Sequence, residues 1–170
     1  AGNSATATQK VSIIDTTPPS ITAPEAVQIE ATSALENIVE LGEVTASDYI
    51  GIGSITNNAP EVFPVGKTTV TWTATDVNGN VSTGVQIVTI VDNEDPTITA
   101  PADIVTPVNA PGCTASGVIL GVPVFSDNCG IASVTNDGLA NYPVGVTTVT
   151  LTVTDINGNT GTATQLVTVT

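Results

Sequence analysis

The sequence contains no histidine and no methionine, and only two of its residues, Lys10 and Lys67, are basic. Without histidine the chain lacks the side chain that most often serves as a general base near neutral pH. Asp and Glu contribute 16 residues, so the formal net charge is −14. This charge repels the phosphates of nucleic acids and of anionic lipids, so we exclude both as partners. A charge of this sign does attract divalent cations.

Long apolar runs and aromatic residues are also scarce. No stretch of about 18 uninterrupted apolar residues is present, so we expect no membrane insertion. Aromatic residues make up 3% of the chain, too few to line a cleft in which paired carboxylates would cleave a glycoside. We therefore predict that the chain is not an enzyme. The absence of an initiator methionine predicts a processed chain or a segment of a longer protein, and such a segment would not contain a signal peptide.

The chain contains one sequence twice, together with a shortened third copy. FPVGKTTVTWTATDVNGNVSTGVQIVTIV begins at Phe63, and YPVGVTTVTLTVTDINGNTGTATQLVTVT begins at Tyr142. The shortened copy, AGNSATATQKVSII, occupies residues 1–14. The matching residues Asn3, Asn80 and Asn159 lie 77 and then 79 positions apart. Such periodicity indicates a tandem array of one structural unit.

Alternating threonine and aliphatic residues indicate that these units are built of β-strands. Val70, Trp72 and Ala74 alternate with threonines, which predicts that Trp72 belongs to the core and not to a ligand site. Asn78-Gly79 supplies a tight hairpin turn after this strand. A further strand is expected within residues 35–44, and roughly seven short strands fit each unit. We predict an all-β chain of tandem immunoglobulin-like β-sandwich domains joined by short proline-containing linkers.

The linkers set the predicted domain boundaries. DTTPP at residues 15–19 and DNEDP at residues 92–96 each precede a similar opening segment. Their prolines resist continuation of a sheet ladder, which makes the joints short and stiff. We therefore predict one sandwich over residues 15–91 and a second over residues 92–170.

Residues 1–14 have the sequence of a final strand without its hairpin partner. A strand needs a neighbour to satisfy its backbone groups. We expect these residues to be the last strand of a preceding repeat, cut from a longer array. Alternatively they are donated to a neighbouring subunit, with Val11 and Ile13 directed into its core.

Cys113 and Cys129 are the only cysteines, and both belong to the second repeat. Ala34 and Ile50 hold the matching places in the first repeat, so the two cysteines occur together, as expected of a disulfide. Zinc binding is disfavoured because the chain has no CxxC spacing and no histidine. We predict a disulfide that stabilises the domain by about 3 kcal/mol and indicates an oxidising, extracellular setting. Two free buried thiols are the alternative.

Acidic residues gather in the linkers and in matching loops, and they suggest a calcium site. Calcium takes about six to eight oxygen ligands, which carboxylates and backbone carbonyls of a short linker can supply. Asp76 and Asp155, which precede the NGN turns, are better explained as turn formers that bond to the local backbone. Asp48 occupies the same loop in the first repeat as Asp127 in the second. The predicted calcium ligands are Asp15, Asp92, Glu94, Asp95 and Asp127.

Several short motifs follow one another in a fixed order. They are a D-x-x-P-P opening, SDNCG at residues 126–130, YPVG, TTVTLTVTD and NGN. In this combination they resemble the hyalin repeat, or HYR domain, over residues 15–170. The first repeat departs from the pattern, because it has SDYIG at residues 47–51 and lacks both cysteines. The resemblance implies an extracellular module related in fold to immunoglobulin-like and fibronectin type III domains, strung in tandem in adhesive proteins such as large bacterial surface adhesins.

These observations predict a structural or adhesive repeat segment of a secreted surface protein or filament, acting as an extended stalk. Its partners would be neighbouring repeats or identical subunits, and calcium is the only cofactor that the sequence suggests. One alternative is a self-assembling filament subunit that uses strand donation. The other is a binding module whose loops recognise a glycan or a cell-surface protein.

Overall fold

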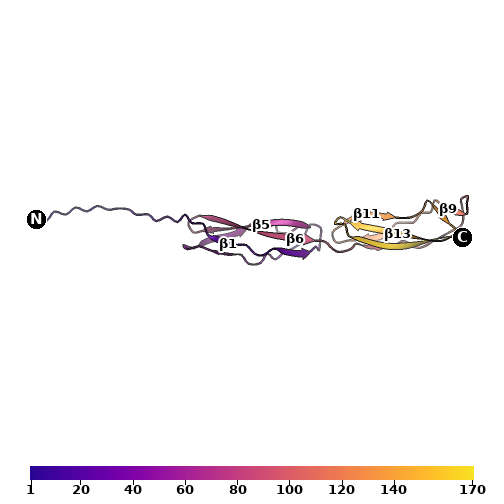
Figure 1. Cartoon of the computed structure of the whole chain (residues 1–170), viewed down its shortest axis with the longest axis horizontal. Coiled ribbons are helices and arrows are strands. Elements are labelled where there is room, and N and C mark those ends of the chain that lie inside the picture. Colours follow the sequence, from indigo (N-terminus) through magenta and orange to yellow (C-terminus); the bar gives the residue numbers. More distant parts are fainter. The chain divides into compact units, whose positions relative to one another are not determined.

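The two long hairpins that the sequence predicts dominate the fold. The computed structural model describes residues 1–170 and is all-β (Figure 1). Strand β5 (Gly66–Asp76) pairs with β6 (Val81–Val91), and β13 (Gly145–Asp155) pairs with β14 (Thr160–Val169). The turn glycines Gly79 and Gly158 have φ of +94° and +100°, a backbone region open to glycine because it has no Cβ. None of the elements is a helix of the length and hydropathy that a membrane span requires.

Short strands complete the sandwich around the first hairpin. Strands β2, β6, β5 and β4 form one sheet in that order, and β1 pairs antiparallel with β3 to form the other. Pro24 lies between β1 and β2, where it cannot donate to a ladder. The short strands are β1 (Ser20–Thr22), β2 (Val27–Glu30), β3 (Thr45–Ser47) and β4 (Ile52–Asn57).

The second hairpin has the same arrangement with two additional short strands. Strands β11, β13, β14 and β8 form its main sheet, in which β8 runs parallel to β14. Strand β7 pairs with β10, and β9 pairs with β12. The short strands are β7 (Thr97–Thr99), β8 (Ile104–Thr106), β9 (Thr114–Ser116), β10 (Val124–Ser126), β11 (Ile131–Asn136) and β12 (Asn141–Pro143).

Contacts between residues divide the chain into two compact units. The first comprises Ala1–Val27, Glu40–Pro60 and Thr68–Val88. The second comprises Gln28–Val39, Glu61–Lys67 and Thr89–Thr170.

The cores consist of the inward-facing residues of the hairpin strands. In β5 the side chains of Val70, Trp72 and Ala74 are buried, which confirms the predicted core position of Trp72. In the second repeat the core cluster consists of Ala115, Tyr142, Val149, Val167 and Val169. Alternation with threonine therefore places one face of each strand inward, as the period of two requires.

A buried glutamine in each repeat bonds two backbone carbonyls. Gln86 donates to the carbonyls of Glu25 and Leu41 at 2.8 and 2.7 Å and accepts from the Trp72 indole at 3.1 Å. Gln165 donates to the carbonyls of Ala102 and Leu120 at 2.6 and 2.9 Å. These bonds offset the cost of burying the two NH2 groups, while Oε1 of Gln165 is buried without a partner. These contacts attach irregular segments to the hairpin.

The strand predicted within residues 35–44 does not form. The only ladder contact there is a single bridge between Asn37 and Phe63. The Asn37 side chain accepts from the backbone of Thr32 at 2.8 Å and donates to the carbonyls of Ser33 and Phe63. A buried asparagine that satisfies the local backbone in this manner replaces a sheet ladder.

The structure assigns no strand to residues 1–14. Val11 and Ile13 are 75% and 96% exposed, whereas the matching Val88 and Ile90 are buried. The reason is that no neighbouring strand lies beside this segment to pair with its backbone.

The structure contradicts the predicted disulfide, because Cys113 and Cys129 are both free thiols. Cys113 adjoins Thr114, whose partner Pro143 lies just before the start of β13. Cys129 lies beside Gly130, whose carbonyl accepts from Ile156 just after the end of β13. A strand of this length separates the thiols by on the order of 30 Å, whereas a disulfide needs Cα atoms within about 7 Å.

Candidate metal centre

The aspartate before each NGN turn is the acceptor for that turn. Oδ1 of Asp76 accepts from the backbone N–H groups of Asn78 and Asn80, both at 2.8 Å, and Oδ2 accepts from the Asn80 side chain at 2.7 Å. Asp155 repeats this arrangement with Asn157 and Asn159. The turn-forming role predicted for the two aspartates is therefore confirmed.

A second aspartate of each repeat is held by the loop after a short strand. Oδ1 of Asp48 accepts from the backbone of Ile50 and Gly51 at 2.8 and 3.1 Å. Oδ1 of Asp127 accepts from Cys129 and Gly130, both at 2.8 Å. The other oxygen of Asp127, Oδ2, is buried and has no hydrogen-bond partner.

The third aspartate lies in the linker that precedes each repeat. Oδ1 of Asp15 accepts from the Thr17 backbone at 3.0 Å, while its Oδ2 is buried without a partner. The Asn80 side chain donates to the backbone carbonyl of Asp15 at 3.2 Å. In the second repeat Asn159 makes the same bond to the carbonyl of Asp92 at 3.1 Å. Each linker is thus bonded to the hairpin turn of the repeat that follows it.

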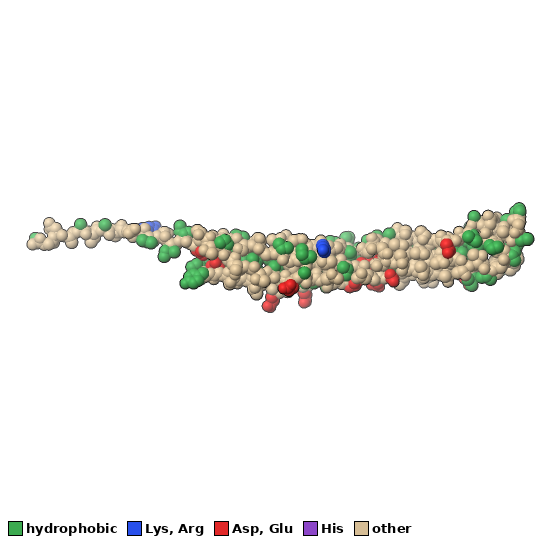
Figure 2. Space-filling model, viewed as in Figure 1, with side chains coloured by type: hydrophobic (Ala, Val, Ile, Leu, Met, Phe, Trp, Pro, Cys, Tyr) green, Lys and Arg blue, Asp and Glu red, His purple; other side chains and the backbone are tan.

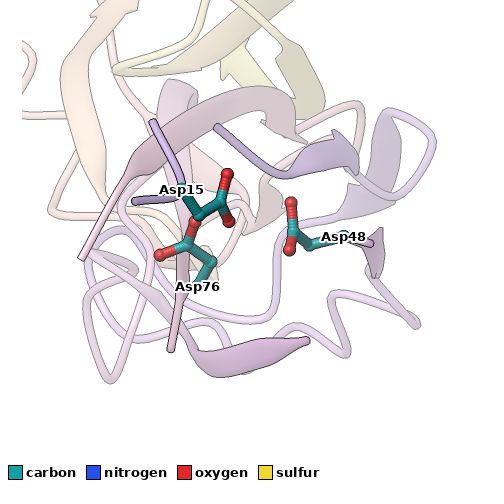
Figure 3. A group of neighbouring side chains, drawn as sticks. All are labelled: Asp15, Asp48 and Asp76. Carbon is teal, nitrogen blue, oxygen red and sulfur yellow. The ribbon is translucent and has the colours of Figure 1, made fainter. Parts of the chain in front are cut away.

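These three segments bring carboxylates together in both repeats. One oxygen each of Asp15, Asp48 and Asp76 lie within 4.8 Å of one another, and the three carboxylates face a common space (Figure 3). Asp92, Asp127 and Asp155 form the matching group in the second repeat. Oxygens on opposite sides of a calcium ion lie about 5 Å apart, because each is roughly 2.3–2.6 Å from the ion. The spacing and the unpartnered oxygens therefore fit a cation with oxygen ligands.

The predicted ligands divide into two classes in the structure. Asp15, Asp92 and Asp127 belong to these groups, which we call the aspartate clusters. Glu94 and Asp95 are exposed linker residues outside both clusters. Asp48 also belongs to a cluster but was not among the predicted ligands, although its match to Asp127 in the other repeat was a sufficient signal. Asp76 and Asp155 were predicted to form turns instead of binding a metal, but both residues form turns and belong to the clusters.

The hydrogen bonds of the turns determine the charge state of their aspartates. Burial acts to raise the pKa of Asp76, but bonds from the Asn80 side chain and from the backbone of Asn80, Asn78 and Gly79 outweigh it, so the pKa lies below 3.8. Asp155 has the same balance, with bonds from Asn159, Gly158 and Asn157. Both carboxylates are therefore ionised at neutral pH and available to a cation.

A pH dependence of stability follows from these lowered pKa values. In the unfolded chain the carboxylates take up protons near their ordinary pKa of 3.8, before the folded chain does. Their contribution to stability is therefore complete above that pH and is lost as the pH falls through the lowered pKa. We expect the double substitution Asp76→Asn and Asp155→Asn to flatten the acid limb of a plot of urea midpoint against pH, measured in chelator. An Asp95→Asn control should keep the full acid loss, and an equally steep limb in the double variant would contradict this account.

The second cluster lies beside the buried thiol of Cys129. Burial raises the pKa of this thiol to about 12, assisted by its hydrogen bond to Asp92 and by the charges of Asp127 and Asp155. Ile50 holds the same place in the first repeat. The thiol is therefore protonated and, unlike a disulfide sulfur, makes no covalent link across the domain.

The chain matches one protein family twice. The HYR domain family matches residues 14–90 and again residues 91–169. Hyalin from Strongylocentrotus purpuratus is 37% identical over 171 residues, which cover 93% of this chain and 14% of that protein. Hyalin from Lytechinus variegatus is 38% identical over 183 residues, which cover 99% of this chain and 34% of that protein. The chain therefore spans about a third or less of the length of these relatives.

Solved structures with some similarity are cadherin ectodomains. Drosophila N-cadherin EC1-4 has a TM-score of 0.44 and 13% identity, covering 91% of this chain and 50% of that one. Protocadherin Gamma C5 EC1-3 has a TM-score of 0.39 and 14% identity, covering 89% of this chain and 68% of that one. Similarity at this level says nothing about function.

Proposed function

Because the chain belongs to the HYR domain family, we propose that it is a structural and adhesive repeat segment of an extracellular surface protein or filament. Its role is mechanical, as a stalk whose joints are stiffened by bound calcium. The absence of histidine and the shortage of aromatic residues support a role other than catalysis. We propose that the whole protein contains further repeats of the same kind, because the curated relatives are longer than this chain.

One observation carries this proposal: a linker aspartate belongs to each aspartate cluster. Asp92 precedes the second repeat, and it meets Asp127 from a loop and Asp155 from the hairpin turn. A cation bound by all three fixes the linker segment to the body of the repeat. Asp15 has the same position before the first repeat, so one mechanism serves every joint of an array.

Calcium fits these clusters better than magnesium or zinc. Three carboxylates and nearby backbone carbonyls provide the hard oxygen ligands that calcium accepts in flexible geometry. Magnesium demands a nearly ideal octahedron and releases its water reluctantly. Zinc prefers thiolate and imidazole ligands, and the one neighbouring thiol, Cys129, is protonated because its pKa is raised to about 12. Without a cation the three carboxylates repel one another, so binding also removes an unfavourable interaction.

Calcium should raise the melting temperature of the chelated protein. A ligand that binds only the folded state stabilises it by about 2.7 kcal/mol at roughly 100 times its Kd. For a domain of this size that corresponds to a rise in Tm of more than about 10 °C. Differential scanning calorimetry with calcium, with magnesium and with chelator measures the effect, and magnesium should give the smaller shift.

The linker acids provide a matched pair of variants for this experiment. Asp92→Asn should abolish the calcium-dependent shift of the second repeat, because Asp92 belongs to a cluster. Glu94→Gln removes one charge from the same linker outside the cluster and should leave the shift unchanged. Equal losses in the two variants would show that calcium acts only through net charge, and no shift in the unsubstituted chain would contradict calcium binding.

Assembly by strand donation is a second candidate function, favoured by the exposure of the N-terminal segment. Val11 and Ile13 have the alternation of a core strand but lie 75% and 96% exposed. Ile13 also borders an open apolar groove together with Tyr49 and Ile50. Figure 2 shows apolar side chains along this segment and where it meets the first repeat. Pairing with the sheet edge of a second copy would bury them.

Strand donation predicts oligomers whose size increases with protein concentration. Ile13→Asp should abolish them, because it places a charge on the apolar face of the segment. Ser12→Asp is the matched control, since its side chain occupies the alternate face, and it should leave assembly intact. Light scattering coupled to size-exclusion chromatography measures the mass. A concentration-independent monomer would exclude donation and would leave the stalk proposal standing.

A further inference from the structure

Each hairpin turn carries an Asn-Gly pair, and the two pairs differ in how they are restrained. They are Asn78-Gly79 and Asn157-Gly158, and the asparagines are exposed in both repeats. Asparagine followed by glycine is prone to spontaneous deamidation, because glycine has no Cβ to shield its backbone nitrogen from the preceding side chain. The turns are otherwise alike, since Asp76 and Asp155 bind the same N–H positions.

In the second repeat both reacting groups are restrained. The Asn157 side-chain amide donates to Oδ2 of Asp92. The Gly158 nitrogen donates to Oδ1 of Asp155 at 2.6 Å. The first bond prevents the amide from rotating towards the backbone. The second engages the attacking nitrogen, and the adjacent negative charge opposes the loss of its proton.

In the first repeat the restraint on the asparagine amide is missing. The Asn78 side-chain amide makes no hydrogen bond within its compact unit, and the matching linker oxygen, Oδ2 of Asp15, has no partner. The Gly79 nitrogen donates to the backbone carbonyl of Asp76 at 3.3 Å and is also bonded to the Asp76 carboxylate, so the two turns differ mainly in the restraint of the asparagine amide. We therefore infer that Asn78 is a site of spontaneous deamidation and that Asn157 is protected.

The reaction requires only water. The Gly79 backbone nitrogen loses its proton and attacks Cγ of Asn78, and ammonia leaves as a five-membered succinimide forms. Water then opens the ring at either carbonyl and produces aspartate or isoaspartate. The net change is one amide and one water converted to one carboxylic acid and one ammonia, without any oxidation. Isoaspartate adds a methylene to the backbone of the turn whose N–H groups bind Asp76.

The two sites can be compared within one molecule. The chain is aged in chelator at mildly alkaline pH and then cleaved after acidic residues, which releases residues 77–92 and 156–170 as separate peptides. Mass spectrometry with isoaspartyl methyltransferase labelling quantifies the products. We expect modification at Asn78 to be about tenfold faster, the effect of one hydrogen bond to a charged group. Equal rates, or a faster rate at Asn157, would overturn the inference.

Two further measurements separate the restraint from other causes. In concentrated urea the two sites should react at similar rates, and a tenfold ratio that persists there would assign the difference to sequence instead. Asp92→Ala should raise the Asn157 rate towards that of Asn78, whereas Asp15→Ala should leave Asn78 unchanged. An Asn157 rate unaffected by Asp92→Ala in a folded protein would also overturn the inference.

Discussion

A thiol reagent added at neutral pH should label Cys113 about a thousandfold faster than Cys129. The Cys113 side chain is exposed, and Cys129 is buried. The pKa of Cys129 is about 12, against an ordinary 9.0, and this difference reduces its reactive thiolate roughly a thousandfold. The higher intrinsic nucleophilicity of a thiolate with a raised pKa offsets part of this factor, and the restricted access caused by burial acts in the opposite direction.

Stopped-flow labelling followed by peptide mapping measures the two rates. In urea both thiols should react at comparable rates, because burial and the neighbouring charges of Asp92 and Asp127 are removed. Cys113→Ser should eliminate the fast phase and leave the slow one. If neither thiol of the native chain reacts, the result would instead support the disulfide that was predicted from the sequence.

Truncation of Tyr142 should destabilise the second repeat by about 3–5 kcal/mol, as expected for a large aromatic residue removed from a core. Tyr142 is 1% exposed and packs in the core cluster of that repeat. Its hydroxyl accepts from the Leu139 backbone at 3.1 Å. Tyr142→Phe removes only this bond and should cost about 1 kcal/mol.

Urea unfolding followed by two probes locates this effect. Trp72 is the only tryptophan and lies in the first repeat. The urea midpoint reported by its fluorescence should therefore be the same in Tyr142→Ala as in the unsubstituted chain. Far-ultraviolet circular dichroism follows all strands and should show a second, earlier transition. Tyr49→Ala removes a fully exposed tyrosine and should change neither signal. Equal destabilisation of both signals by Tyr142→Ala would contradict separate cores.

Local patterns in the sequence predicted the hairpins correctly because the separate sequence signals agree with one another there. In β5 and β13 the β-branched residues, the alternation and the Asn-Gly turns all favour one register. Residues 35–44 are apolar enough for a strand, but the Asn37 side chain donates to the backbone carbonyls of Ser33 and Phe63. Such competition depends on a distant carbonyl, which the sequence alone does not place.

The cysteine prediction failed for a different reason. Two residues that are present in one repeat and absent from the other vary together. This pattern does not say how far apart the two side chains lie. Cys113 and Cys129 lie at opposite ends of β13, and only the strand pairing reveals this. The disulfide consequently gives no support to an oxidising setting, and the proposed extracellular location rests on the HYR family alone.

The aspartate clusters were predicted in part. The repeat offset matches Asp15 to Asp92 and Asp48 to Asp127, and the acidic linkers were recognised as candidate ligands. Which linker acids take part depends on the path of the chain, which directs Asp92 into the cluster and leaves Glu94 exposed. The fold brings a linker, a loop and a turn together. A motif within one of these segments therefore does not predict the cluster.

Calcium titration by calorimetry on the chelated chain tests the central claim most directly. We expect two calcium ions to bind per chain, because each repeat has one aspartate cluster. Asp155→Asn should reduce the number to one, and adding Asp76→Asn should abolish binding. Absence of binding heat in the unsubstituted chain, or two ions still bound by the double variant, would contradict it.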